Sequence, residues 1–297
     1  MPDRVLPLDD LASMAGEKYL ADVVHLGELE RLFPINSAAW MAIVDLLKEI
    51  QQESQWMRTA ALPRDEVTLL PPIARPPKLL MLAGNYAAHI EEQGGVAKER
   101  AQTFPYVFMK PATTTLIGDR ALVQLPAISP NKIDHEVELA VVIGREARHV
   151  KAEDALDYVA GYTIINDISD RGFHPNVNRE TRPKDQFFDW LHGKWHDGFC
   201  PCGPCLVTSD EISDPQSLKI ALSVDGEVRQ SGSTAEQVFS VAEIIAFISS
   251  WMTLEPGDII STGTPAGVGN ATGKYLRAGQ TMIATIQSIG QLHNTIV

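Results

Sequence analysis

The stretch from Asp134 to Gly144 constrains the fold of this chain more than any other. It reads Asp-His-Glu-Val-Glu-Leu-Ala-Val-Val-Ile-Gly, and its β-branched and apolar residues, closed by a glycine, predict a strand. Alternate residues of a strand face the same side, so Glu136 and Glu138 project together, roughly 6–7 Å apart. Two such carboxylates beside apolar residues repel each other unless a positive charge lies between them. A divalent cation would supply that charge, whereas an edge strand with two solvated glutamates would need none.

A second strand with an acidic end is predicted a short distance along the chain. Residues 161–167 read Gly-Tyr-Thr-Ile-Ile-Asn-Asp, which is again an apolar run that ends in an acid. If the two strands are neighbours in a sheet, Asp167 completes a site of three carboxylates.

The composition is that of an ordinary globular protein. Hydrophobic residues make up 44% of the 297 residues and charged residues 21%, which is ample core material for one large domain or a main domain with an appendage. The formal net charge of −13 argues against nucleic acid or an anionic membrane as a partner, because both need basic patches. An anionic substrate would need a local cation, from a metal or from Lys and Arg.

The cysteines and the N-terminal sequence bear on the compartment. No apolar run reaches membrane-spanning length, and the first residues lack the basic-then-apolar layout of a signal peptide. The three cysteines, Cys200, Cys202 and Cys205, are an odd count that fits a reducing cytoplasm. A structural zinc site needs four ligands, so His192 or His196 would have to complete one here. We favour small buried thiols and expect a cytoplasmic protein.

Two regions are predicted along the chain. Apolar residues recur at helical spacing within residues 26–50, and the proline-rich stretch 70–77 then interrupts regular structure. We therefore predict a small, partly helical N-terminal region over residues 1–74 and a main domain over residues 75–297. Short apolar runs separated by Gly, Pro and Asp predict a β-rich α+β fold for the main domain. One helix is expected over residues 240–252, where Ser240 and Glu243 can form a capping box.

A histidine and a glutamate lie close together after the first strand of the main domain. His89 and Glu92 are three residues apart, so one helical turn would bring them into contact. A carboxylate that orients a histidine is a common way of making a general base near neutral pH. The pair Gly94-Gly95 could be a hinge, and residues 91–100 a lid. A simple surface pair is the alternative.

Two lysines and one loop are candidates for holding an anion. Lys110 follows an aromatic run and Lys194 has aromatic neighbours, so either could hold a substrate carboxylate, although a solvated cation is the default for a single lysine. Residues 261–269 read Ser-Thr-Gly-Thr-Pro-Ala-Gly-Val-Gly after another strand, and their backbone N–H groups could cradle an anion. The loop has neither the P-loop nor the dinucleotide pattern, and a plain turn is the alternative.

Taken together, these motifs resemble the fumarylacetoacetate hydrolase family over roughly residues 78–290. The resemblance runs in order through Gly84-Asn85-Tyr86 with His89, Met109-Lys110-Pro111, and residues 135–144, 161–167, 225–230 and 254–269. The Glu-x-Glu strand together with the Gly-Thr-Pro loop makes it specific. The resemblance implies a mixed β-sandwich roll, preceded here by the small helical N-terminal region. It also implies a homodimer and a Mg²⁺ or Mn²⁺ site at the mouth of the sheet.

The resemblance implies a role for particular positions of this sequence. The implied metal ligands, which suit a hard cation with open positions for water and substrate, are Glu136, Glu138 and Asp167. The implied catalytic residues are His89, Glu92 and Lys194. The residues expected to contact the substrate are Lys110, Arg171, Gly263 and Thr264, of which Thr264 matches a loop residue that contacts the substrate carboxylate.

One stretch departs from the family pattern. After the metal aspartate the family usually reads Ser/Thr-Ala-Arg-Asp, whereas this chain reads Ser169-Asp170-Arg171-Gly172. An acid is gained at position 170 and one is lost at position 172. The departure leaves the metal ligand in place but changes the residues around it. The substrate of the family pattern therefore does not transfer directly to this chain.

The leading functional hypothesis is hydrolysis of a carbon–carbon bond in a 1,3-diketo acid of the acylpyruvate type. The metal would hold the 2-oxo acid end, and Glu92 would orient His89 to remove a proton from water. Lys194 would stabilise the oxyanion, and the products would be pyruvate and a carboxylic acid.

Other functions share the same metal-bound 2-oxo acid. They are decarboxylation of oxaloacetate, and isomerisation or decarboxylation of hydroxymuconate-type diacids; a catalytically silent binding protein is a further alternative. In each case the partner is a small-molecule oxo acid. Residues 173–192 are expected to form part of the pocket wall, and at least half of their cations are expected to be solvated.

Overall fold

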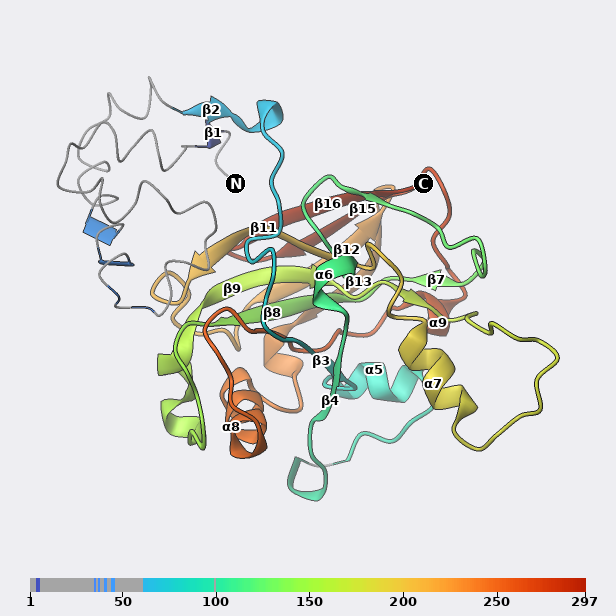
Figure 1. The fold of residues 1–297 in the computed structure, drawn as a ribbon, viewed down its shortest axis with the longest axis horizontal. Coiled ribbons are helices and arrows are strands. Elements are labelled where there is room, and N and C mark those ends of the chain that lie inside the picture. The colour runs from blue at the N-terminus through green and yellow to red at the C-terminus, as the bar shows by residue number, and fades with distance from the viewer. Residues whose placement is uncertain are drawn as a thin grey trace.

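The computed structural model describes residues 4–5, 35, 37, 40–41, 44–45, 61–98 and 100–297. The helices expected within residues 1–60 therefore lie almost wholly outside the described residues. Strand β1 (Arg4–Val5) pairs antiparallel with β2 (Leu62–Pro63), which joins the start of the chain to the segment that leads into the main domain. Both lie away from the helices α5 (Ala87–Glu92), α7 (Asp185–His192) and α9 (Gly269–Thr272) (Figure 1).

A seven-stranded sheet contains the stretch that we singled out in the sequence. Its strands, in spatial order, are β4 (Tyr106–Met109), β3 (Leu79–Ala83), β14 (Ile259–Ser261), β8 (Val137–Ile143), β9 (Val159–Asn166), β11 (Cys200–Thr208) and β5 (Leu116–Ile117). Strand β8 is central and every one of its residues is buried. The strand expected over 134–144 is present over the shorter range of β8, with Asp134 on a separate strand, and its alternative as an edge strand is wrong. Strands β8 and β9 are antiparallel neighbours, as the three-carboxylate site requires.

A five-stranded sheet packs against the first one. Its strands, in spatial order, are β13 (Glu227–Ser233), β12 (Lys219–Val224), β15 (Thr281–Ile286), β16 (Gly290–Ile296) and β6 (Leu122–Val123). The main core includes Leu139 of β8, Leu222 of β12 and Leu292 of β16. The other face of β8 packs in a second cluster, with Ala140 and Val142 beside Leu79. Because side chains alternate along a strand, Glu138 points to the side of this second cluster.

The helices lie at the edges and ends of the sheets. Within residues 61–98 and 100–297 the α-helices are α5 (Ala87–Glu92), α6 (Ala112–Thr115), α7 (Asp185–His192), α8 (Val241–Trp251) and α9 (Gly269–Thr272). The short strands β7 (Ile133–Asp134) and β10 (Ser169–Asp170) pair as a small separate ladder. The helix expected over 240–252 is confirmed as α8, because Ser240 and Glu243 form the expected capping box. Helices α5, α7 and α9 gather at one end of the sheets (Figure 1). The β-rich α+β fold predicted for the main domain is confirmed.

The cysteines are part of the core. Cys200 and Cys202 lie two residues apart on β11 and are buried in the second cluster, while Cys205 is half-buried and all three thiols are free. Burial raises the pKa of the Cys200 and Cys202 thiols above the usual range. Within the described residues, the cysteines join no group of three potential metal ligands. The expectation of small buried thiols is confirmed for Cys200 and Cys202 and holds only in part for Cys205. In the described part of the chain, no helix is long and apolar enough to cross a membrane.

Candidate active site

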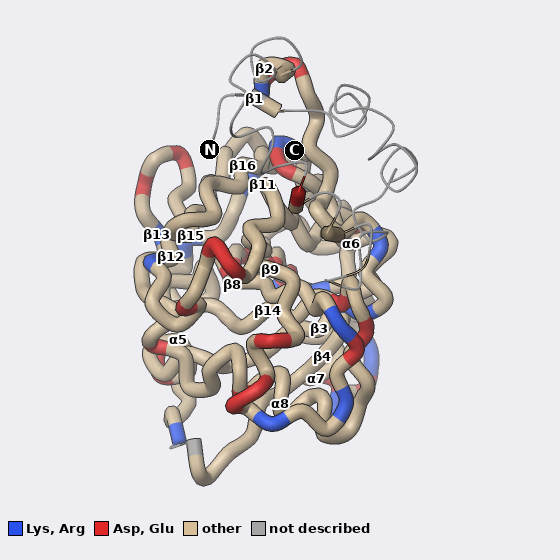
Figure 2. The backbone as a smooth tube through the Cα atoms, turned by 90° about the vertical axis from the view of Figure 1, so that its left-hand side faces the viewer, with Lys and Arg blue, Asp and Glu red and all other residues tan. Residues whose placement is uncertain are grey.

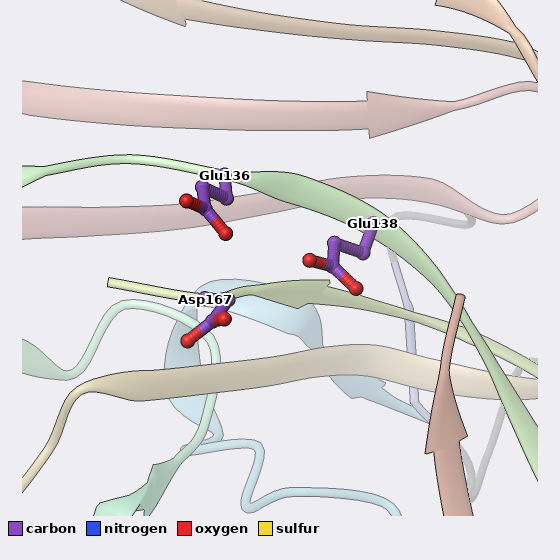
Figure 3. Close-up of side chains that lie close together, drawn as sticks. All are labelled: Glu136, Glu138 and Asp167. Carbon is purple, nitrogen blue, oxygen red and sulfur yellow. The ribbon is translucent and has the colours of Figure 1, made fainter. Parts of the chain in front are cut away.

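Three carboxylates converge where β8 begins and β9 ends. The register pairs Val137 with Asn166, so Glu136 lies opposite Asp167, and the Asp167 N–H donates to the Glu136 carbonyl over 2.8 Å. One oxygen from each of Glu136, Glu138 and Asp167 lies within 4.8 Å of the other two, and all three residues are buried. Figure 3 shows the three side chains turned toward one another. The grouping expected from the sequence is therefore present.

Burial and mutual repulsion oppose the negative charges of Glu136, Glu138 and Asp167. Burial raises the pKa of Glu138 above its usual range, and the charges of Asp167 and Glu136 raise it further. Burial also opposes ionisation of Glu136, but the charges of Lys194 and Arg171 outweigh it and lower the pKa of Glu136. A divalent cation would relieve this repulsion. Buried carboxylate oxygens that share one small space are the donor set that Mg²⁺ or Mn²⁺ prefers, so the residues fit such an ion.

Hydrogen bonds hold the carboxylate of Glu138 in place. One of its oxygens accepts from the Ser261 hydroxyl over 2.6 Å and from the Gly263 N–H over 2.7 Å. Gly263 has a φ of +89°, and a Cβ there would lie 2.8 Å from the Asn85 Cβ, so glycine suits both the backbone and the space. The N–H of Gly263 is thus used on Glu138. Because this N–H is already bonded to Glu138, it does not support the substrate contact expected for Gly263, which remains a prediction.

The two lysines are buried and paired, so the solvated alternative is wrong for both. The Lys194 ammonium donates to Glu136 over 3.0 Å, to Asp167 over 2.5 Å and to the Ser169 hydroxyl over 2.9 Å. Burial disfavours its charge, but Asp167 and Glu136 outweigh this and raise the pKa of Lys194. Its ammonium also lies 5.6 Å from the ring centre of Trp190 on α7.

Lys110 lies behind the three carboxylates. Its ammonium donates to Asp167 over 2.6 Å, to the Phe199 carbonyl over 2.6 Å and to the Ile168 carbonyl over 3.1 Å. Its side chain is fully buried and does not line the cavity described below. Lys110 therefore supports Asp167. Its side chain has no surface in the cavity with which to make the substrate contact that the sequence suggested.

Arg171 connects the carboxylates to the residues that depart from the family pattern. Its guanidinium donates to Asp134 over 3.0 Å and forms an ion pair with Glu136. The carboxylate of Asp170 accepts one hydrogen bond from the Gly172 N–H in the same turn and one from the Ser129 hydroxyl, each over 2.9 Å. The acid gained at position 170 therefore shapes the turn that presents Arg171.

His89 and Glu92 form the expected pair on α5. Nδ1 of His89 lies 2.7 Å from one oxygen of Glu92, and the other oxygen accepts from the Gly267 N–H over 2.8 Å. Their side chains are only 12% and 18% exposed, so the simple surface pair is wrong. The helix is thus attached to the 261–269 loop through Glu92. The contact uses Nδ1 and leaves Nε2 of His89 for a reacting group.

One cavity of about 1110 Å³ joins these elements. The candidate residues that line it are His89, Glu136, Glu138, Arg171, Lys194 and Thr264. The 173–192 segment contributes to its wall as expected, including Phe173, His174, Arg179 and Trp190. Arg179 is paired with Asp189, whereas Arg182 is largely exposed and pairs with Asp185. Basic and acidic positions lie side by side near α7 (Figure 2).

The comparisons with known proteins identify the family. The sequence model of the family described as fumarylacetoacetate (FAA) hydrolase C-terminal matches residues 78–297. This chain belongs to the fumarylacetoacetate hydrolase family. Oxaloacetate tautomerase FAHD2A, mitochondrial, of Homo sapiens is 37% identical over 278 residues, which cover 93% of this chain and 84% of that protein.

Solved structures of the fumarylacetoacetate hydrolase family resemble the fold of this chain. The 5-carboxymethyl-2-hydroxymuconate delta-isomerase from Mycobacterium smegmatis matches with a TM-score of 0.65 and 38% identity, over 80% of this chain and 84% of that one. Maleylpyruvate hydrolase from Sphingobium sp. SYK-6 matches with a TM-score of 0.72 and 29% identity, over 100% of this chain and 94% of that one. The relatives are named as a tautomerase, an isomerase and a hydrolase, so family membership alone leaves the reaction open.

Sequence reasoning missed the residues that support the loop of this family member. Gln230 of β13 donates to the Thr264 hydroxyl over 2.7 Å and accepts from the Val137 N–H over 3.1 Å. The Asn85 amide group donates to the Thr262 carbonyl over 2.8 Å and accepts from the Phe239 N–H over 2.8 Å. Both lie within the motifs that carried the resemblance, but their partners are far along the chain. No local pattern predicts such contacts.

Proposed function

We propose that this protein is a metal-dependent tautomerase or isomerase of small 2-oxo dicarboxylic acids, which interconverts their enol and keto forms. The observation that carries the proposal is that His89 lines the same cavity as Glu136 and Glu138, whose carboxylates converge with that of Asp167. Similarity to an oxaloacetate tautomerase over 93% of this chain supports the same reaction class. Hydrolysis, the leading expectation from the sequence, becomes the second candidate.

The residues of the cavity fit an enol–keto reaction. A divalent cation held by Glu136, Glu138 and Asp167 would act as a Lewis acid toward the oxo-acid end of the substrate. In the enol-to-keto direction, Nε2–H of His89 delivers a proton to the carbon next to the carbonyl, while the enol hydroxyl releases its proton to solvent. In the reverse direction His89 removes the same carbon-bound proton. Glu92 holds the imidazole through Nδ1 in both directions.

The charge of the cavity favours a substrate with two carboxylates. Its described lining has five basic side chains, Lys98, Lys132, Arg171, Arg179 and Lys194, and five acidic ones, Glu136, Glu138, Asp170, Asp185 and Asp189. These charges balance, and Asp167, which is outside the lining, is offset by its partner Lys110. A bound divalent cation would therefore leave an excess of two positive charges. A dianionic oxo acid of the oxaloacetate type neutralises that excess, whereas a monoanion does not.

Hydrolysis of an acylpyruvate-type substrate is supported by the His89–Glu92 pair, because that pair can also activate water. It requires a donor for the oxyanion, and Lys194 was the expected one. The ammonium of Lys194 is already engaged by Glu136, Asp167 and Ser169. In the enol–keto reaction a cation held by the three carboxylates would stabilise the enolate oxygen, so no further donor is required, which is why we place hydrolysis second.

The proposal is tested by measuring the rate of ketonisation of enol-oxaloacetate, which is monitored as the loss of enol absorbance. We expect the protein with Mg²⁺ or Mn²⁺ to accelerate ketonisation beyond the metal alone, and EDTA to abolish the acceleration. Pyruvate is measured in the same samples, and acetylpyruvate is offered in parallel. Stoichiometric pyruvate from oxaloacetate would indicate a decarboxylase. Pyruvate from acetylpyruvate without accelerated ketonisation would indicate the hydrolase, and no metal-dependent change in either compound would favour a binding protein.

A further inference from the structure

A histidine–carboxylate pair supports the cavity wall at the position where this chain departs from the family pattern. Asp170, the acid gained there, lines the cavity, whereas His196 does not. Oδ2 of Asp170 lies 3.3 Å from Nε2 of His196. The Asp170 side chain is fully buried, and that of His196 is 19% exposed. The pair therefore runs from the wall into the protein behind it.

The two atoms of this contact depend on each other. Oδ2 of Asp170 and Nε2 of His196 are both buried, and among the described residues neither has a hydrogen-bond partner. They lie at ion-pair distance, although their alignment is not that of a hydrogen bond. A buried carboxylate without a counter-charge is costly, so a protonated imidazole at His196 would stabilise Asp170. The ring centres of Phe173 and Phe199 lie 5.4 Å and 4.9 Å from that of the imidazole and restrict its movement.

A backbone contact joins the same two segments a second time. The Asp170 N–H donates to the Gly193 carbonyl over 2.9 Å. A Cβ at Gly193 would lie 2.3 Å from the Asp170 carbonyl oxygen, so glycine permits this close approach. Lys194, which lies between Gly193 and His196, is bonded to two members of the carboxylate cluster, which consists of Glu136, Glu138 and Asp167. The segment 193–196 is therefore anchored to the cluster, and Asp170 is attached to that segment.

Arg171 directly follows Asp170 and is the group that this attachment would position. Its Nε donates to Asp134, and its Nη2 forms the ion pair with Glu136. These contacts leave Nη1, and Arg171 lines the cavity. Because Nη2 of the same planar group contacts a member of the carboxylate cluster, Nη1 lies at the edge of that cluster. There it can donate to a carboxylate oxygen of a bound oxo acid.

We propose that Asp170 and His196 are positioning residues, which fix the Arg171 guanidinium beside the carboxylate cluster and thereby set the affinity for an oxo-acid carboxylate. The inference rests on the proposed function for the class of ligand and extends it to residues behind the cavity wall. Loss of the pair leaves the turn of Arg171 attached to segment 193–196 by the backbone bond alone. The guanidinium is then held less precisely, and a carboxylate that it contacts is bound less tightly.

The affinity for oxalate, a small dicarboxylate that resembles the oxo-acid end of the substrate, tests this role without turnover. Titration calorimetry at saturating Mg²⁺ measures its Kd. Asp170→Asn and His196→Phe should each raise the Kd by about tenfold, the effect of one hydrogen bond to a charged group. The double variant should show the same rise and not their product, because the two side chains act as one unit. The KM for enol-oxaloacetate should rise in parallel while kcat stays within about twofold, because proton transfer belongs to His89.

His293→Phe is the matched control, because His293 faces the buried Asp119 over 3.6 Å and neither residue lines the cavity. It should leave the Kd of oxalate unchanged. Asp170→Asn keeps an oxygen for Ser129 and Gly172, so it decides the test alone if His196→Phe does not fold.

Three results would overturn the role of the pair: an unchanged Kd in Asp170→Asn, multiplied effects in the double variant, or a loss in kcat with no change in KM. A wild-type protein that binds oxalate but does not ketonise oxaloacetate would reject the proposed function, and the Kd values would still decide the role of the pair. Neither binding nor ketonisation by the wild type would reject both.

Discussion

At the scale of single residues, charge decides what each side chain of the site can do. Three buried carboxylates, of which Glu138 has a raised pKa, repel one another when no cation is bound. The same three groups are suitable ligands for a divalent cation. The spacing of Glu136 and Glu138 was visible in the sequence, because a strand has a period of two. The burial of Lys110 and Lys194 was not, because a single lysine is solvated by default.

Glu138→Gln should weaken Mg²⁺ binding by about 100-fold or more, since even residues that only support a metal ligand affect affinity by about 10–100-fold. The fold should persist, because the amide oxygen of the introduced glutamine can accept from Ser261 and Gly263 as the carboxylate does. Titration calorimetry with Mg²⁺ and Mn²⁺ measures the affinity. Glu153→Gln is the control, because Glu153 is an exposed partner of Lys151. Unchanged affinity in Glu138→Gln would remove Glu138 from the metal site.

Lys110→Met should act on stability. It leaves the buried Asp167 carboxylate without a cation on that side and two carbonyls without a donor. Removing one partner of a buried ion pair costs about 3–5 kcal/mol, which urea unfolding in EDTA can measure. A variant with unchanged stability and a raised KM would instead restore the substrate contact that the sequence suggested.

At the scale of elements, the site is assembled by attachments between segments that are far apart in sequence. Helix α5 is joined to the 261–269 loop by the Gly267 N–H bond to Glu92, and Gln93 accepts from the Asn270 amide over 2.7 Å. Strand β8 joins the same loop through Glu138 and Gly263. The loop thus fixes both the carboxylate cluster and the His89–Glu92 pair. The hinge at Gly94-Gly95 and the lid at 91–100 remain predictions.

Gly267→Ala should impair the His89–Glu92 pair without affecting the carboxylate cluster. Gly267 has a φ of +108°, and a Cβ there would meet the Arg229 carbonyl at 2.1 Å, so the backbone must shift and disturb the Gly267 N–H bond to Glu92. We expect kcat to fall by about 100-fold, the scale of general acid–base catalysis, while Mg²⁺ affinity stays near that of wild type. Gly273→Ala is matched, since its φ is +73° with nothing within 4 Å of the added Cβ. Equal kcat values for the two variants would contradict the attachment.

The elements also show where sequence reasoning stops. The short apolar runs at residues 78–83, 218–224 and 281–286 form the strands β3, β12 and β15, because their apolar patterns are strong and local. Strand β11 was not foreseen, since it reads Cys-Pro-Cys-Gly-Pro-Cys-Leu-Val-Thr and prolines disfavour a central strand. The structure places a register shift between Gly203 and Val207, and Pro204 falls within it. Tertiary packing here overrides local propensity.

At the scale of the whole molecule, two sheets enclose one core and place the cavity at the end where α5, α7 and α9 gather. Strand composition predicted a β-rich fold, but not the order of the strands, which depends on pairing between distant segments. The division at residue 74, the homodimer and the cytoplasmic location remain predictions.

Mg²⁺ should stabilise the whole fold if it binds the native carboxylate cluster and not the unfolded chain. At a free concentration of 100 times its Kd, a ligand of this kind adds about 2.7 kcal/mol to the free energy of unfolding. We expect the thermal midpoint to rise when Mg²⁺ is added after EDTA dialysis. At the same concentration Glu138→Gln should gain only about 0.4 kcal/mol or less, because a site that is 100-fold weaker is at most half saturated. An equal rise in both proteins would place the binding elsewhere.

The most direct test of the central claim is the ketonisation rate of enol-oxaloacetate by His89→Gln, with Mg²⁺ affinity measured on the same sample. The claim joins a cation at Glu136, Glu138 and Asp167 to proton transfer by His89, which lines the same cavity as the two glutamates. It predicts a rate lower by about 10²–10⁴-fold than that of wild type at an unchanged Mg²⁺ affinity. A His89→Gln protein that binds Mg²⁺ normally and ketonises oxaloacetate at the wild-type rate would contradict it.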